Sequence, residues 1–139
     1  MEIGNPHKEY ETDGRHVFSC QYHVIFCPKY RRKVLEESIQ ERLKEIILEK
    51  QKEYSYKVLE MEVMEDHVHM ILSVNPRTPG GIYWVVSKIK GCSSHALREE
   101  FPKLRSRMPC LWSGSRFIST VGSVTLEIVK KYIEDQKGK

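Results

Sequence analysis

Two strand-like runs in the middle of the chain, 56–64 and 67–74, are separated only by Glu65 and Asp66. Both runs are rich in β-branched and apolar residues, which favour strands. Because so short a polar connection joins antiparallel neighbours, the two runs are predicted to form a β-hairpin.

A third strand-like run, 16–27, precedes the hairpin and ends at Pro28, and a fourth follows the hairpin at 117–121. Alternate positions of the run before the hairpin carry apolar or aromatic side chains, which is the pattern of a strand with one buried face. These positions are Phe18, Cys20, Tyr22, Val24 and Phe26.

Apolar residues at helical spacing mark three further segments. The first covers 38–54 and begins with Ser38 and Glu41, a capping-box signature. The second starts at Ile82 and ends near Phe101-Pro102, and the third opens at Gly122-Ser123. Their apolar positions are Ile39, Leu43, Ile46, Ile47 and Tyr54, then Ile82, Val85, Val86, Ile89, Ala96 and Leu97, then Ile128, Val129, Tyr132 and Ile133.

The predicted order of elements is therefore β-α-β-β-α-β-α. This is the split β-α-β order of an α+β, ferredoxin-like (RRM-like) fold, an antiparallel sheet with helices over one face, with one helix appended at the carboxyl end. The length of 139 residues suits one domain, predicted at 16–139. Residues 1–15 are polar and show no period, so they are predicted to be a flexible arm.

The net charge is only +4, but the positive residues are clustered. One cluster precedes the first helix, another alternates along a predicted loop after the second helix, and a pair lies on a predicted polar face of that helix. Such clusters either contact phosphates or belong to an ordinary solvated surface, and spacing alone does not decide between these. The residues are Lys29, Arg31, Arg32 and Lys33, then Lys103, Arg105 and Arg107, then Lys88 and Lys90.

The four cysteines show neither a Cys-x-x-Cys pair nor a disulfide-like spacing, so reduced thiols, mostly in the core, are expected. They are Cys20, Cys27, Cys92 and Cys110. The chain has no signal-like start and no run of about 18 apolar residues, the length that spans a bilayer. We therefore expect a cytoplasmic protein with no membrane partner.

His67 and His69 flank Val68 in the second strand of the predicted hairpin. Because side chains alternate across a strand, both imidazoles face one side, where two nitrogens can converge on a metal ion. Single histidines in strands are mostly structural, and a stable site would need a third ligand. Asp66 either orients an imidazole or merely serves the turn, and the turn is the slightly favoured interpretation.

The last predicted helix offers that third ligand. Tyr132 and Gln136 are four residues apart and so project from the same helix face. If this face lies over the histidines, Gln136 can give an amide oxygen to the metal while Tyr132 points at the substrate. The alternative is that Tyr132 only packs beside Val129 and Ile133 and that Gln136 is a solvated helix end.

Taken together, these stretches resemble the single-strand transposases of the insertion sequence 200/605 family, within the superfamily named for two histidines around a hydrophobic residue (HUH). The resemblance spans nearly all of 16–136. It is carried by the order and spacing of Tyr22-His23-Val24-Ile25-Phe26, Pro28-Lys29-Tyr30-Arg31-Arg32, Met64-Glu65-Asp66-His67-Val68-His69, Lys90-Gly91-Cys92-Ser93-Ser94, Leu111-Trp112, Thr120-Val121-Gly122 and Tyr132-Ile133-Glu134-Asp135-Gln136.

The resemblance implies that His67, His69 and Gln136 hold Mg²⁺ or Mn²⁺ and that Tyr132 is the nucleophile. It implies cleavage and rejoining of single-stranded DNA beside hairpins at the ends of an element, through a 5′-phosphotyrosine, by a homodimer that needs no nucleotide cofactor. One departure is Arg116, where similar sequences usually carry an aromatic residue, and this leaves contacts near the fourth strand open.

On this interpretation, Lys29, Arg31, Arg32, Lys33, Lys88 and Lys90 are candidate phosphate contacts, and Tyr83 or Trp84 is a candidate for stacking a base. Burial of at least one of these two rings is the more ordinary expectation. Three alternatives remain: a binding module without catalysis, a hydrolase in which water attacks the phosphate, and a domesticated relative with the same active-site residues.

Overall fold

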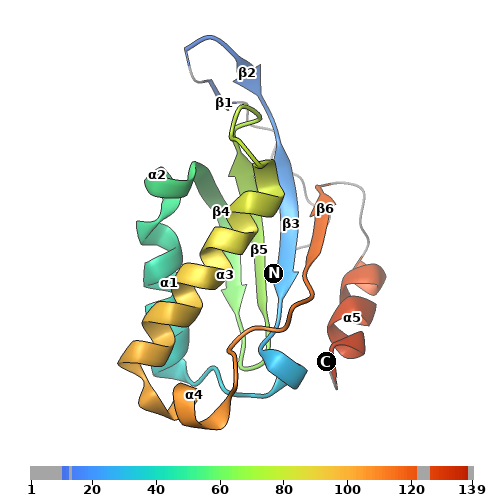
Figure 1. The fold of residues 1–139 in the computed structure, drawn as a ribbon. Coiled ribbons are helices and arrows are strands. Elements are labelled where there is room, and N and C mark those ends of the chain that lie inside the picture. The colour runs from blue at the N-terminus through green and yellow to red at the C-terminus, as the bar shows by residue number, and fades with distance from the viewer. Residues whose placement is uncertain (1–10, 13, 122–125, 138–139) are drawn as a thin grey trace.

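A four-stranded antiparallel sheet forms the centre of the molecule, in the order β4-β5-β3-β6 (Figure 1). The computed structural model describes residues 11–12, 14–121 and 126–137. The strands are β3 (Gln21–Phe26), β4 (Tyr56–Val63), β5 (Val68–Val74) and β6 (Phe117–Thr120). This strand order and the element order confirm the ferredoxin-like prediction, including the β4–β5 hairpin.

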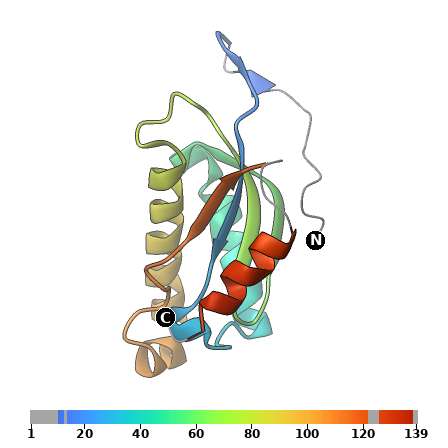
Figure 2. The same cartoon turned by 90° about the vertical axis from the view of Figure 1, so that its right-hand side faces the viewer.

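The two faces of the sheet are covered by different helices (Figures 1 and 2). Helices α1 (Glu37–Glu49) and α3 (Gly81–Glu100) pack on one face and enclose the main core. Helix α5 (Leu126–Asp135) lies on the other face, where Ile25 contacts Phe117, Tyr132 and Ile133. The appended helix is thus confirmed, although its predicted start at Gly122-Ser123 lies outside the described residues.

Strand β5 shows how the residue pattern sets these faces. Val68, Met70 and Leu72 are fully buried in the main core, as their alternation predicts. The residues between them, His69 and Ile71, are also buried but point to the other face. Since both faces of this central strand are covered, its position in the sheet is fixed from both sides.

The amino-terminal elements differ from the prediction. The run 16–27 is divided into β2 (Val17–Phe18) and β3, and β2 pairs with β1 (Glu11–Thr12) in a small separate ladder. Part of the expected arm is therefore paired, Gly14 and Arg15 connect β1 to β2, and residues 1–10 and Asp13 lie outside the described residues. Val17 is 73% exposed, so this ladder adds little to the core.

The capping-box prediction is wrong. Helix α1 begins one residue before Ser38, and its N-cap, Glu36, makes no side-chain cap hydrogen bond. Ser38 is therefore already inside the first turn, where its hydroxyl cannot serve as the cap. The predicted segment also divides into α1 and α2 (Gln51–Tyr54), which ends at Ser55 in a left-handed conformation with φ 59°.

The basic loop predicted after α3 is a helix, α4 (Pro102–Arg107). Pro102 occupies the first turn, where its fixed φ favours a helix and its missing N–H costs nothing. Leu104, 2% exposed, anchors the helix to the main core. Lys103, Arg105 and Arg107 therefore lie on a short helix rather than alternating along an extended segment.

All four cysteines are free, as predicted, but only Cys27 is buried; Cys20 and Cys92 are half-buried and Cys110 is exposed. The expectation that most are core thiols is therefore wrong. Within the described part of the chain, no helix has both the length and the apolar character that crossing a membrane requires.

Candidate metal and tyrosine site

His67 and His69 stand at the start of β5, with Val68 turned into the main core between them. His67 immediately precedes the strand, and its side chain is 18% exposed. His69 is inside the strand and 3% exposed. The predicted alternation is confirmed for Val68 and His69, which point to opposite faces of the sheet, whereas His67 lies one residue outside the strand.

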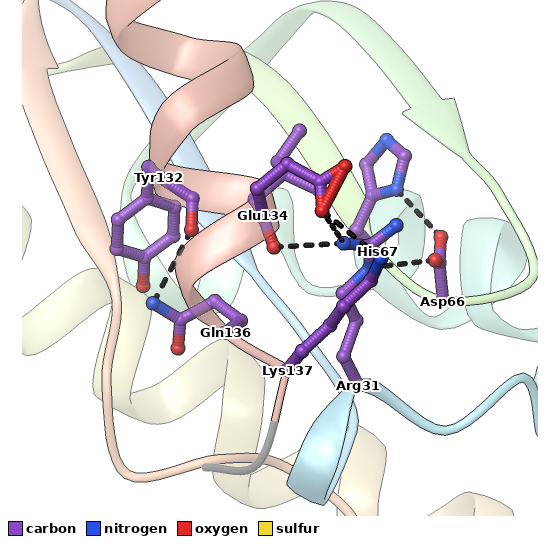
Figure 3. Close-up of polar contacts among 8 residues, drawn as sticks. Arg31, Asp66, His67, Tyr132, Glu134, Gln136 and Lys137 are labelled. Atoms are coloured by element: carbon purple, nitrogen blue, oxygen red, sulfur yellow. Dashed lines mark hydrogen bonds and ion pairs between the residues drawn. The ribbon is translucent and has the colours of Figure 1, made fainter.

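Asp66 holds His67 in place. Its Oδ1 lies 2.9 Å from Nδ1 of His67, and its Oδ2 accepts a hydrogen bond of 2.7 Å from Nε of Arg31 (Figure 3). Burial raises the pKa of Asp66, but the hydrogen bonds from His67 and Arg31 outweigh burial and leave that pKa below its ordinary value. Asp66 therefore orients an imidazole. The sequence analysis slightly favoured a role in the turn instead. The contact uses Nδ1 of His67 and leaves its Nε2 available.

Arg31 connects the Asp66–His67 pair to the helix that carries Tyr132. Its Nη1 donates to the backbone oxygen of Ile133 at 3.1 Å and lies 3.2 Å from Oε2 of Glu134 (Figure 3). Tyr30 and Arg31 both adopt left-handed backbone conformations, with φ 61° and 53°. Such conformations cost about 1–3 kcal/mol for residues other than glycine and are concentrated at functional sites.

The phosphate contact expected of Arg31 is not supported by its surroundings. The side chain is only 15% exposed, and its guanidinium already serves Asp66, Ile133 and Glu134. A planar guanidinium with several fixed donors suits such a junction between two elements. Arg31 is thus a structural link between the histidine strand and α5.

His69 has a neighbour that the sequence analysis did not single out. Nδ1 of His23 lies 3.3 Å from Nε2 of His69, and the ring centroids are 5.5 Å apart. Burial, with a smaller contribution from His23, lowers the pKa of His69 to about 4, and burial likewise lowers the pKa of His23. Both rings are therefore neutral at physiological pH, the state in which imidazole binds metals.

Tyr132 is half-buried on α5. Its hydroxyl lies 2.9 Å from Oγ of Ser115, and its ring packs against Phe117 with centroids 5.3 Å apart. Burial raises the pKa of Tyr132 above its ordinary value, although the hydrogen bond with Ser115 opposes this. In this position the phenol is neutral at physiological pH and hence a weak nucleophile.

Gln136 follows α5 and is 2% exposed, so the interpretation of a solvated helix end is wrong. Its Nε2 approaches the backbone oxygen of Tyr132 at 3.4 Å, which keeps the two residues together (Figure 3). Its Oε1 is buried and has no hydrogen-bond partner among the described residues. A buried acceptor without a partner is costly and calls for an explanation such as a bound ion.

The predicted site residues therefore form two groups in one chain. Tyr132 and Gln136 lie together, while His67 and Asp66 lie on the opposite side of Arg31 and Glu134 (Figure 3). Among the described residues, neither Tyr132 nor Gln136 makes a hydrogen bond or ring contact with His67 or His69. Arg31 is the physical connection between the groups.

The donor chemistry nevertheless fits a divalent cation. Within the described residues, no three His, Cys, Asp or Glu side chains form a group that could hold a metal, so two imidazoles here need a donor of another type. The partnerless Oε1 of Gln136 is an oxygen donor of that type. Two nitrogens and one amide oxygen would leave positions for substrate oxygens; the set itself is compatible with Zn²⁺, and phosphate oxygens at the open positions would favour Mg²⁺ or Mn²⁺.

The basic residues that were predicted to contact DNA phosphates differ in how exposed they are. Lys29, Arg32 and Lys33 lie near the surface, and Lys29 and Arg32 flank the 44% exposed ring of Tyr30, at 5.2 Å and 5.5 Å from its centroid. Lys88 is exposed over the ring of Trp84 at 5.7 Å. These residues remain available to a phosphate backbone.

Lys90 does not lie on a polar face, so that expectation is wrong. It is 8% exposed, and its Nζ donates to the backbone oxygens of Ser113 at 2.6 Å and Ser115 at 3.4 Å. Burial, together with the nearby charge of Arg116, lowers the pKa of Lys90 to about 8. Its ammonium supports the segment that contacts Tyr132 and is not accessible to DNA.

Arg116 takes part in a surface contact of its own. Its guanidinium lies 4.6 Å from the ring centroid of Tyr83, and Nη1 donates to Oγ of Ser87 at 2.7 Å. Tyr83 is 66% exposed, whereas Trp84 packs edge-on against Tyr54 at 5.7 Å. One of the two candidate stacking rings is therefore in a packed position, as expected, and Tyr83 is the accessible one.

Comparison with known proteins shows extensive sequence similarity. The chain matches the family described as "Transposase IS200 like" over residues 16–136. It is 36% identical over 126 residues to the ISDra2 transposase TnpA of Deinococcus radiodurans, with 89% of each chain covered. It is 30% identical over 125 residues to the transposase for insertion sequence element IS200 of Salmonella typhimurium, with 86% of this chain and 81% of the relative covered.

Comparison with solved structures also finds transposases. The crystal structure of a transposase from Deinococcus radiodurans R1 matches with a TM-score of 0.83 at 29% identity, covering 93% of this chain and 99% of that one. A REP-associated tyrosine transposase bound to a REP hairpin matches with a TM-score of 0.57 at 12% identity, covering 89% of this chain and 68% of that one, which supports the fold alone. These similarities define a DNA-cleaving transposase. The chain belongs to the IS200/IS605 transposase family.

Proposed function

We propose that this transposase cuts and rejoins single-stranded DNA through Tyr132 and uses Mg²⁺ or Mn²⁺ held by His67, His69 and Gln136. The observation that carries the proposal is the buried Oε1 of Gln136, one helical turn from Tyr132, for which the described part of the chain supplies no hydrogen-bond partner. The helix that bears Tyr132 is tied through Arg31 to the Asp66–His67 pair. Arg31 thus links one proposed metal ligand, His67, to the helix of the nucleophile, while His69 lies beside His23.

The proposed reaction is an in-line displacement at phosphorus. When bound, the divalent cation would neutralise charge on the scissile phosphate. Oη of Tyr132 forms a bond to phosphorus while the bond to the 3′ oxygen breaks; the phenol loses its proton, and the departing oxygen gains one to become a 3′ hydroxyl. The 5′ phosphate stays esterified to Tyr132, so a second 3′ hydroxyl can reverse the step without a nucleotide cofactor.

The surroundings of Tyr132 indicate what must change before attack. The phenol is held by Ser115 and by packing on Phe117, with a raised pKa. Because a neutral phenol attacks poorly, the hydroxyl has to exchange Ser115 for the phosphate and lose its proton there. We expect positioning and charge neutralisation to supply most of the rate acceleration.

The proposed substrate is a DNA hairpin with flanking single strand. The REP-associated transposase that shares the fold is described as bound to a REP hairpin. In this chain, the exposed ring of Tyr30 between Lys29 and Arg32 offers a stacking surface beside two cations, as single-strand binding requires. Lys33 and Lys88 add accessible positive charge. Since each chain has one Tyr132, exchange of two DNA ends calls for a homodimer.

A covalent-adduct assay tests the proposal. The protein is incubated with single-stranded oligonucleotides that carry the hairpins flanking its reading frame, with Mn²⁺, and the products are separated in denaturant. We expect a protein–DNA adduct that survives denaturation and is absent when EDTA is added. Binding without any adduct at either end sequence would favour the alternative of a binding module.

Replacing Arg31 by Lys should slow adduct formation. Lysine keeps the charge but cannot hydrogen-bond Asp66, Ile133 and Glu134 together, because it lacks the several N–H donors of the planar guanidinium. Removing the groups that orient a metal ligand typically costs about 10- to 100-fold in activity or metal affinity. Single-turnover rates measure this, with the charge-conserving change Lys44→Arg, at an exposed position of α1, as the control. Equal rates for the two variants would remove Arg31 from the site.

The Lys29→Gln/Lys33→Gln double variant should bind single-stranded DNA more weakly at low salt. If both side chains contact phosphates, the slope of log affinity against log salt should fall in magnitude by about 0.7 for each phosphate that is no longer neutralised. Fluorescence anisotropy at several salt concentrations measures the slope. Lys44→Gln, an exposed change on α1, is the control. A slope unchanged from wild type would mean that neither lysine contacts the backbone of the DNA.

A further inference from the structure

His23 occupies a position that only the assembled sheet reveals. It lies on β3, is 0% exposed, and faces the same side of the sheet as His69. The antiparallel register pairs Ile25 with His69 and His23 with Ile71, so the two histidines are diagonal neighbours across the β3–β5 pair. At this spacing two imidazoles can reach each other, and Nδ1 of His23 lies 3.3 Å from Nε2 of His69.

The 3.3 Å contact between two imidazole nitrogens limits how the rings can interact. A neutral imidazole carries one N–H donor and one bare acceptor nitrogen, so one ring must donate across this contact and the other must accept. If His69 accepted at Nε2, its proton would sit on Nδ1, and neither nitrogen could bind a metal ion. If His69 donates from Nε2, its Nδ1 is bare and able to bind one.

In His67, too, one ring nitrogen makes a hydrogen bond and the other is available to a metal ion. Its Nδ1 lies 2.9 Å from the carboxylate of Asp66, which leaves Nε2 as the free nitrogen. Metal-binding histidines usually donate their other ring N–H to a fixed acceptor, which sets the tautomer and the ring orientation. In the proposed site Asp66 is that acceptor for His67, and His69 needs one of its own.

We infer that His23 is a positioning residue that fixes His69 as its Nε2–H tautomer, as Asp66 fixes His67. This inference rests on the proposed metal site, because metal binding is what requires an unprotonated Nδ1 on His69. In this arrangement Nδ1 of His23 accepts from His69, and Nε2 of His23 carries the proton. That Nε2 is buried and has no hydrogen-bond partner within the described residues, so a histidine that only filled space here would be destabilising.

The first test is made on the metal-free full chain labelled with ¹⁵N-histidine. Long-range ¹H–¹⁵N correlation spectra report which nitrogen of each ring carries the proton. We expect His69 as a single Nε2–H tautomer in wild type and in His23→Asn, since Asn Oδ1 replaces the Nδ1 acceptor. In His23→Leu we expect a mixture of tautomers or the Nδ1–H form. An Nδ1–H tautomer of His69 in wild type, or an unchanged spectrum in His23→Leu, would overturn the inference.

The second test is Mn²⁺ affinity measured by electron paramagnetic resonance. We expect His23→Leu to weaken Mn²⁺ binding by about 10- to 100-fold and His23→Asn to restore most of it. His95→Ala, at a side chain 82% exposed, is the control and should match wild type. Thermal melts of each variant establish that it is folded, and equal affinity of wild type and a folded His23→Leu would contradict the inference.

The two tests also separate this inference from the proposed function. If wild type fails to bind Mn²⁺ and yields no adduct, the metal site is wrong, and the inference falls with it even though the tautomer is measured. If wild type binds Mn²⁺ and His69 is the Nδ1–H tautomer, the site stands and the role of His23 is wrong.

Discussion

Tyr132→Phe should yield no cleaved strand and no covalent adduct, while folding and hairpin binding remain. The variant removes only the hydroxyl, and with it the 2.9 Å hydrogen bond with Ser115; the ring still packs on Phe117 and beside Ile25. Removing one hydrogen bond costs about 1 kcal/mol of stability, too little to unfold a domain. Denaturing electrophoresis of labelled oligonucleotides with Mn²⁺ measures both products.

The same variant separates the proposed reaction from hydrolysis. If water attacked the phosphate, Tyr132→Phe would leave cleavage largely intact, since the proposed metal ligands are untouched. Tyr54→Phe provides the matched control because Tyr54 lies at the end of α2 and packs against the main core, on the sheet face opposite α5. Cleavage retained in Tyr132→Phe would assign the reaction to a hydrolase.

His67→Ala and His69→Ala should each remove Mn²⁺ binding and strand cleavage together. Each change deletes one of two imidazole donors, and the remaining imidazole and the amide of Gln136 are too few to hold the cation. Isothermal titration with Mn²⁺ measures affinity, and the adduct assay measures cleavage. A loss of cleavage with unchanged Mn²⁺ affinity would mean that the histidines act on DNA and not on a metal.

The two histidine variants should differ in stability, which offers an internal check. His69 is 3% exposed, so truncation leaves a cavity, whereas the His67 side chain is 18% exposed and at the edge of the strand. We expect the larger fall in melting temperature for His69→Ala. Titrations are therefore made well below both melting temperatures, with His95→Ala as the surface control.

The fold could be predicted because its signals are local. The short β4–β5 connection, the alternation in β5 and the helical spacing in α1 and α3 each depend on neighbours within a few residues. The elements that were missed are those whose local signal is weak. The β1–β2 ladder has two residues in each strand, and α4 depends on Pro102 and on the packing of Leu104.

The sequence revealed the types of candidate ligand but not how they are held. The spacing of His67 and His69 follows from strand geometry, but the neighbour of His69 depends on the register between β3 and β5, which no local pattern specifies. The role of Arg31 depends on a left-handed backbone at two residues other than glycine and on α5, about a hundred residues later in the chain.

Lys90 is a different case, because a signal for its burial was present. It falls four residues after Val86 and seven before Leu97, on the stripe of α3 that packs into the core. Its charge favoured a polar face, but the backbone oxygens of Ser113 and Ser115 satisfy the ammonium inside. Helical position outweighed residue type at this site.

The most direct test of the account is to identify the residue that carries DNA. Adduct formed with a short hairpin oligonucleotide and Mn²⁺ is digested with nuclease and trypsin and analysed by tandem mass spectrometry. The account predicts a 5′-phosphodiester remnant on the tyrosine of the tryptic peptide Tyr132-Ile133-Glu134-Asp135-Gln136-Lys137. A remnant on any other residue, or cleaved DNA with no modified peptide, would contradict it.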